Sequence, residues 1–146
     1  MRGQAGWHAP TRKTFLGLAA LSLCVTSVGC GSQSYRDTAR AAISSMQSDI
    51  TSYNRSRLTD LKSTAAACTR ALHGLAAARA LEKNSPPNQY RSLMAVLRTV
   101  VSMAQRGFAD CAHAAPMLNY PLMFQADREI AAANRWILRA RALDRS

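Results

Sequence analysis

Thiols are the side chains of this protein whose spacing points most directly to chemistry. Four cysteines, Cys24, Cys30, Cys68 and Cys111, lie in a chain of 146 residues. A thiol can be modified covalently, can form a disulfide or can bind a metal, and its neighbours decide which of these is available. Cys30 is the most informative of the four, because it ends a run of small residues near the N-terminus.

The residues before Cys30 have the three parts of an export signal. Arg2, Arg12 and Lys13 give a basic start, an uncharged run extends over residues 14–28, and small residues follow up to the cysteine. The uncharged run is about 15 residues long, which is too short to span a bilayer as a helix. We therefore predict that this segment directs export and does not itself span the membrane.

The same segment resembles the lipobox of bacterial lipoproteins, with Ser27 where that pattern usually has leucine. The resemblance implies that the thiol of Cys30 is diacylated and that the chain is cut just before it. One alternative is a plain secretory signal that is cleaved nearby. The export route is also open, because residues 11–16 resemble a twin-arginine signal in which Lys13 replaces the second arginine.

If Cys24 leaves with the signal and Cys30 carries lipid, Cys68 and Cys111 are the thiols left in an oxidising compartment. We predict a disulfide between them, which would close a loop of 43 residues. The alternative is a pair of buried free thiols. A straight helical hairpin would offset the two cysteines by about 12 Å, so the bond requires a bend at Gly74 or a staggered hairpin.

The charge of the chain is strongly unbalanced. Of nineteen basic residues, only Arg2, Arg12 and Lys13 precede Cys30, and eight acidic residues oppose the rest, which leaves a net charge near +8. Such a surface should attract anions, and for an exported protein these are lipid head groups and anionic envelope polymers, with nucleic acid out of reach. The alternative is a solvated surface without a partner, because the charges are scattered along the chain.

No arrangement typical of catalysis is visible, and we predict that the protein is not an enzyme. Only His73 and His113 remain once the signal is removed, and no nucleophile motif, phosphate loop or pair of carboxylates accompanies them. An alternative is a noncovalent haem or copper site that would use His73, Met94, Met103 and His113. The methionines fit the filling of a core better, so we expect no cofactor and no metal.

Helix is the expected state of the rest of the chain. Residues 35–73 contain neither glycine nor proline, and prolines at 86, 87 and 116 interrupt the pattern further on. Apolar residues at steps of three and four predict three buried stripes: Ile43, Met46, Ile50, Tyr53, Leu58, Leu61, Ala65, Cys68, Leu72 and Leu75; then Tyr90, Leu93, Leu97, Val100, Ala104, Phe108, Cys111 and Ala115; then Met123, Ala126, Ile130, Ala133, Ile137 and Ala140.

These stripes predict an all-α fold, an antiparallel bundle of three helices, or of four if the first helix breaks near Asn54. The stripe slips at Asn54, but the absence of glycine and proline favours an unbroken helix. The expected organisation is a lipoprotein signal peptide over residues 1–29, a lipidated tether over 30–34 and a helical bundle over 35–146.

We expect a lipid-anchored envelope protein with a binding or structural role, on the periplasmic face of the outer membrane if the organism has one. Its partners would be the membrane, through the anchor, and another envelope protein or an anionic envelope polymer. The chain is also similar in size and architecture to the pilotins of secretion systems, which are small helical lipoproteins. That resemblance implies an alternative role, in which the bundle carries a helical segment of a secretion or envelope-assembly partner.

Overall fold

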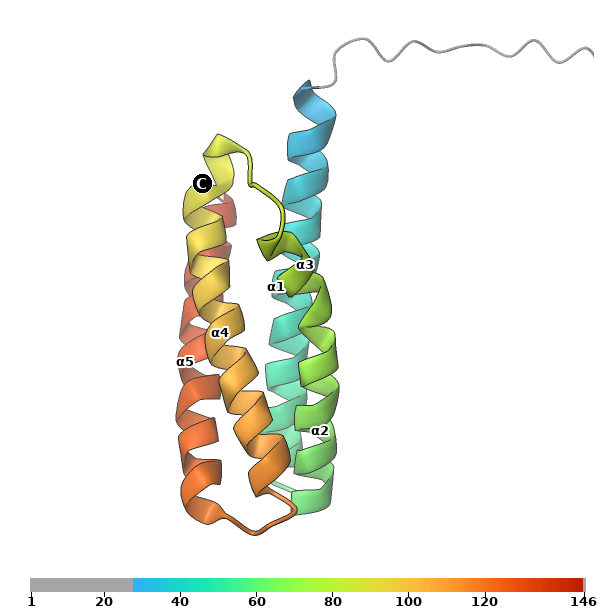
Figure 1. Cartoon of the computed structure of the whole chain (residues 1–146), viewed down its shortest axis with the longest axis vertical. Coiled ribbons are helices and arrows are strands. Elements are labelled where there is room, and N and C mark those ends of the chain that lie inside the picture. The colour runs from blue at the N-terminus through green and yellow to red at the C-terminus, as the bar shows by residue number, and fades with distance from the viewer. Residues whose placement is uncertain (1–27, 146) are drawn as a thin grey trace, which may run out of the picture.

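A computed structural model describes residues 28–145, with side chains from residue 33 onward, and these residues form an antiparallel bundle of four helical rods (Figure 1). The elements are α1 (Val28–Ser56), α2 (Leu61–Gly74), α3 (Ala76–Glu82), the 3-10 turn η1 (Asn88–Tyr90), α4 (Arg91–Ala114) and α5 (Tyr120–Arg145). The predicted all-α bundle is confirmed. Most of the predicted signal peptide, residues 1–27, lies outside the described residues.

Consecutive rods run in opposite directions, with α2 and α3 together forming the second (Figure 1). The rods contact one another in the cyclic order α1, α2, α4, α5, so that α5 closes the bundle against α1. The start of α1 and the end of α5 therefore lie at the same end of the molecule, and the α1–α2 and α4–α5 turns lie at the other (Figure 1).

The unbroken first helix that we favoured is wrong, and the chain instead turns between α1 and α2. Asp60 causes the new start, because its backbone is extended and its side chain accepts a hydrogen bond of 2.7 Å from the backbone N–H of Ser63. The hydroxyl of Ser63 donates to the same carboxylate at 2.6 Å. An aspartate N-cap satisfies an orphan donor of the new helix, so neither glycine nor proline is required.

The turn also shifts the buried face of the second rod. Leu58, predicted in the first stripe, is 81% exposed, and the residues of α2 that are buried are Thr64, Ala67, Cys68 and Ala71. Leu61, Ala65 and Leu72 are only half-buried. A break between two helices changes which side of the second helix faces the core. A single periodic pattern extended from α1 into α2 therefore predicts the wrong buried residues.

The stripes of α4 and α5 are confirmed almost throughout. Among their members only Tyr90 and Met123 are half-buried, and the rest are buried. Phe108 is the largest fully buried side chain, and its ring meets that of Tyr53 from α1 edge-on, with 6.2 Å between the ring centroids. Small residues of α5 such as Ala126, Ala133 and Ala140 allow the neighbouring rods to approach closely.

The first rod begins earlier than the sequence predicts. Residues 30–34, expected to be a tether, continue the helix of α1, which is helical from Val28. One glycine such as Gly31 costs a helix only about 1 kcal/mol, and adding a turn to an existing helix is much easier than starting one. The bundle is therefore joined to Cys30 by helix.

Candidate functional site

Cys30, the predicted lipidation site, lies near the start of α1. The first described contact between α1 and α5 is made by Arg36, six residues further on, which is about 9 Å along a helix axis. The backbone of Cys30 thus lies beyond the point where the rods begin to pack. Acylation of the thiol remains a prediction. The position of Cys30, outside the packed part of the bundle, suits an anchor.

Cys68 of α2 and Cys111 of α4 are paired in a disulfide, with 2.03 Å between the sulfur atoms and 6.1 Å between the Cα atoms. Both residues are buried. The expected axial offset is removed in the way the sequence allowed, because the segment between α3 and α4 runs on past the end of α3 before α4 begins (Figure 1). The hairpin is therefore staggered, and α2 also ends at Gly74.

An ion-pair cluster joins α1 to the last turn of α5. Nε of Arg36 lies 3.0 Å from one carboxylate oxygen of Asp144, and Nε of Arg40 lies 2.7 Å from the other. Arg36 also donates to the backbone carbonyl of Asp144. Burial acts to raise the pKa of Asp144, but the hydrogen bonds from Arg40 and Arg36 outweigh it and hold the pKa below its ordinary value.

This cluster should make stability depend on pH in the acid range. The pKa of Asp144 is lower in the folded state, so the folded state binds fewer protons and the cluster stabilises the fold above the ordinary aspartate range, with the effect lost as pH falls. We expect Asp144→Asn to lower the free energy of unfolding by about 1 to 2 kcal/mol at neutral pH, because it removes the charge that binds both arginines. The loss is modest because the arginines are partly exposed to water. Urea unfolding measured from pH 7 down to pH 3 should show the difference shrinking.

Asp37→Asn is the matched control, since Asp37 is exposed on the same part of α1 and attracts Arg40 without an ion pair among the described residues. Its free energy of unfolding should differ from that of the native protein by less than about 0.5 kcal/mol at every pH. A difference for Asp144→Asn that stays constant down to pH 3 would contradict the role given to its charge.

A hollow of about 430 Å³ lies beside this cluster. Its lining residues are Arg36, Gln89, Tyr90, Ser92, Leu93, Leu143 and Asp144. The charged groups in the hollow, Arg36 and Asp144, bind each other, and the ring of Tyr90 stacks on that of Tyr35 with 5.4 Å between the centroids. These side chains hold the rods together and leave no open charge in the hollow for a small ligand.

A second polar cluster ties α1 to α5 near the other end of the bundle. The hydroxyl of the buried Tyr53 donates to Asp127, and Arg57 donates to the same carboxylate oxygen at 2.9 Å. Burial of the ring, and then its hydrogen bond to Asp127, raises the pKa of Tyr53 above its ordinary value. The phenol therefore stays protonated and acts as a structural donor.

The histidines and methionines of the alternative haem or copper site are divided between exposed and buried positions. His73 and His113 are exposed, Met94 is buried in the core, and Met103 packs against the core from its edge. Within residues 28–145, no group of three or more histidine, cysteine or acidic side chains is placed to hold a metal. Met94 and Met103 thus fill space between helices, the role that their apolar character favours.

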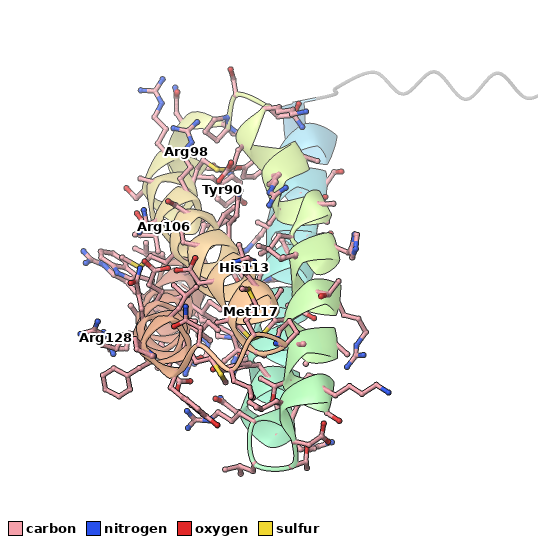
Figure 2. The ribbon with its side chains drawn as sticks, turned by 60° about the horizontal axis from the view of Figure 1, so that its bottom comes forward. Tyr90, Arg98, Arg106, His113, Met117 and Arg128 are labelled. Atoms are coloured by element: carbon pink, nitrogen blue, oxygen red, sulfur yellow. A yellow bond between two sulfur atoms is a disulfide. The ribbon has the colours of Figure 1, made fainter. Side chains whose placement is uncertain are left out.

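Exposed apolar side chains gather at the end of the bundle that carries the α1–α2 and α4–α5 turns. We call this surface the apolar tip, and its residues are Leu58, Met117, Leu118, Tyr120 and Phe124. Figure 2 shows Met117 at the α4–α5 turn, with this end brought forward. Leu118 has a φ of 54°, a conformation that costs a leucine roughly 1 kcal/mol and in which glycine is usual.

The apolar tip was not predicted, because the sequence pattern placed Leu58 in the core and left the residues between the second and third stripes, after Pro116, without a role. The signal that could have found it was the number of large apolar residues within the α4–α5 turn. Turns are usually built from small and polar residues, so Met117, Leu118 and Tyr120 together are unusual there.

No protein-family model matches this chain, and comparison with curated proteins and with solved structures found no match either. Over the described part of the chain, none of the helices combines the length and the apolar character that crossing a membrane would need.

Proposed function

We propose that this protein is a lipid-anchored helical protein of the cell envelope, which binds or spaces other envelope components and performs no reaction. The acylated Cys30 would hold the bundle at a bilayer, on the periplasmic face of the outer membrane in an organism that has one. Anchoring raises the local concentration of the bundle toward partners at that surface.

The observation that carries the proposal is the position of Cys30 on a helix that continues into the bundle. α1 has 29 residues without interruption from Val28 to Ser56, a length of about 43 Å. A lipid on Cys30 would therefore set the distance between the bundle and the membrane through a helix, which is stiffer than a flexible tether. A fixed distance suits a spacing role.

The arrangement of polar groups supports a role without catalysis. The two inter-rod clusters use Asp144 to hold Arg36 and Arg40 of α1, and Asp127 to hold Arg57 of the turn that follows α1. Tyr53 is kept protonated by burial and by Asp127. These groups bind one another across the bundle, as structural groups do. The closed core and the disulfide add rigidity, which serves a spacer.

The apolar tip favours a second candidate function, in which the protein carries an apolar segment of an assembly partner, as a pilotin-like protein would. Leu58 is 81% exposed and Met117, Tyr120 and Phe124 are each 64% exposed, although such side chains are usually covered. The tip lies at the end of the bundle opposite to Cys30 (Figure 1). Capture of a partner by the native protein but not by a Leu118→Ser, Phe124→Ser variant would support this candidate.

The anchor is tested by expressing the native chain and a Cys30→Ala variant in a bacterial host and measuring intact mass and membrane fractionation. We expect the native protein in the membrane fraction, with the mass of residues 30–146 plus acyl chains. The Cys30→Ala variant should lose both the acyl mass and the membrane association. A Cys24→Ala variant is the matched control, because that cysteine is removed with the signal, and it should behave as the native protein does.

An unlipidated native protein that is cut at another position would contradict the anchor. Unchanged membrane fractionation of an unacylated Cys30→Ala variant would contradict the tethering mechanism, because attachment would then have another cause.

A further inference from the structure

The outward side of α5 carries a continuous row of exposed side chains, which we call the basic face. Its residues are Phe124, Arg128, Ala131, Arg135, Leu138, Arg139, Ala142 and Arg145, all of them exposed. At 100° per residue these positions fall within about 120° of the helix circumference. Figure 2 shows Arg128 pointing away from the other rods, so this side of α5 is not covered by the bundle.

The basic face carries mostly positive charge. Asp127 lies at its edge with a side chain that is 35% exposed, and its carboxylate binds Arg57. Among the described residues, Arg128, Arg135, Arg139 and Arg145 make no ion pair. The acidic residues of α5 each form an ion pair with an arginine of another helix or of the α1–α2 turn. Asp144 binds Arg36 and Arg40, Asp127 binds Arg57, and Glu129 lies 3.4 Å from Arg106. Four arginines are thus left for a partner outside the chain.

Large apolar side chains accompany these arginines. Phe124 is 64% exposed and Leu138 is 56% exposed. The guanidinium of Arg128 lies 5.3 Å from the centre of the Phe124 ring, and that of Arg139 lies 5.1 Å from the centre of the half-buried Trp136 ring. A partner of this face must therefore offer both negative charge and an apolar layer.

We propose that the basic face of α5 binds the surface of an anionic phospholipid bilayer. The four arginines would contact lipid phosphates, while Phe124 and Leu138 would enter the boundary between head groups and acyl chains. This mixture of arginine with phenylalanine and leucine is typical of helices that lie in a membrane interface. An anionic polymer offers phosphates or carboxylates but no apolar layer, so it would leave Phe124 and Leu138 in water.

A bilayer also fits better than an acidic partner helix. A partner helix requires a continuous apolar seam, whereas the apolar residues Phe124 and Leu138 are 14 positions, or about 21 Å, apart on the basic face. Arginines occupy the positions between them. Lipid head groups can meet each arginine independently, so no seam is needed.

The inference deepens the proposed function, because it names the anionic partner, but it does not need an acylated Cys30. The end of α5 lies beside the first contacts of α1, as the pairs of Asp144 with Arg36 and Arg40 show. A bundle held through Cys30 would then lie along the same bilayer in place of standing upright on α1, and Phe124 of the apolar tip would also meet the membrane. A lipid group together with a basic surface is a stronger membrane attachment than either alone.

The test measures sedimentation of the unacylated full chain, carrying Cys30→Ser, with vesicles of phosphatidylcholine alone or of equal parts phosphatidylcholine and phosphatidylglycerol. One variant changes Arg128, Arg135, Arg139 and Arg145 to glutamine. The matched control changes four exposed cations of the other rods, Arg55, Lys62, Arg70 and Lys83, to glutamine and has the same net charge. Circular dichroism checks that both variants keep their helix content.

We expect the parent chain to prefer the anionic vesicles. Each basic residue near an anionic surface contributes about fivefold to affinity, so the α5 variant should lose at least about fiftyfold, whereas the control should lose less than about fivefold. Residues 1–29 are present in every variant, so they cannot produce the difference. Equal losses in both variants, or no preference for anionic vesicles in the parent, would overturn the proposal.

Fluorescence separates a bilayer from an anionic polymer. With Trp7→Phe and Trp136→Phe added, Phe124→Trp places the remaining tryptophan on the basic face, and its emission should shift to the blue on anionic vesicles as the ring enters an apolar layer. Soluble polyphosphate should produce no such shift. Binding to polyphosphate as tight as to vesicles, with no blue shift on either, would overturn the bilayer as the partner.

Discussion

Replacing both Cys68 and Cys111 with alanine is expected to lower the free energy of unfolding by about 4 kcal/mol. The bond joins residues separated by 43 positions, and it links the second rod to the third. Without it the unfolded chain regains the freedom of that whole loop, which is the main source of the stabilisation in the chain-entropy description. For a domain of this size, such a loss is a large part of the total stability.

Urea or thermal unfolding of the double variant, compared with the native protein, measures this effect. The double variant is preferred to either single one, because a single variant leaves a buried free thiol and allows mispairing with Cys24 or Cys30 in unprocessed protein. Reductant should destabilise the native protein by a similar amount and leave the double variant unchanged. A double variant as stable as the oxidised native protein would contradict the prediction.

Gly107→Val is expected to lower the free energy of unfolding by about 3 kcal/mol, because α4 and α5 touch at this glycine. A Cβ atom added to Gly107 would lie 2.7 Å from Cγ1 of Ile130 and 3.1 Å from both the backbone oxygen of Ala126 and the backbone nitrogen of Ile130. Backbone atoms of α5 cannot turn aside as a flexible side chain can. Valine would therefore push the two helices apart along their longest contact.

Gly107→Ala should destabilise less, by about 1 to 2 kcal/mol, because alanine offsets part of the clash by its better helix propensity. Gly74→Ala is the matched control. A Cβ atom at Gly74 would lie 2.6 Å from a carboxylate oxygen of Asp49, which is the far end of a side chain and can rotate away. We expect Gly74→Ala to raise stability slightly, by less than about 1 kcal/mol.

Chemical unfolding of the three glycine variants distinguishes a backbone contact from a general effect of replacing glycine. If Gly107→Ala is as harmless as Gly74→Ala, α4 and α5 do not approach as closely at this point as the structure indicates.

The amino-acid sequence by itself determined the parts of the fold that depend on neighbours along the chain. Apolar residues three and four apart gave the buried faces of α4 and α5 correctly, because a helix with one apolar face can be stable only when that face is covered. Prolines at 86 and 87 located the connection before α4, and the proline at 116 located the end of α4. The pair Cys68 and Cys111 was predicted by counting the cysteines that would remain after export. This count required no knowledge of the distance between them.

Only the tertiary structure decided the features that depend on residues far apart in sequence. Nothing in the sequence distinguishes Asp60 from other polar residues, and the structure shows that its side chain caps α2. The turn before this cap places Leu58 at the apolar tip and not in the expected core. In the sequence, Gly107 is only a residue of low helix propensity, and the structure shows that α5 packs directly against it. Helix periodicity places the arginines of α5 on one side, and only the structure shows that they are left without acidic partners on that helix, because Asp127, Glu129 and Asp144 pair with arginines of other segments. Helix periodicity records which residues share a side, whereas packing decides which charges are paired and which side is left open.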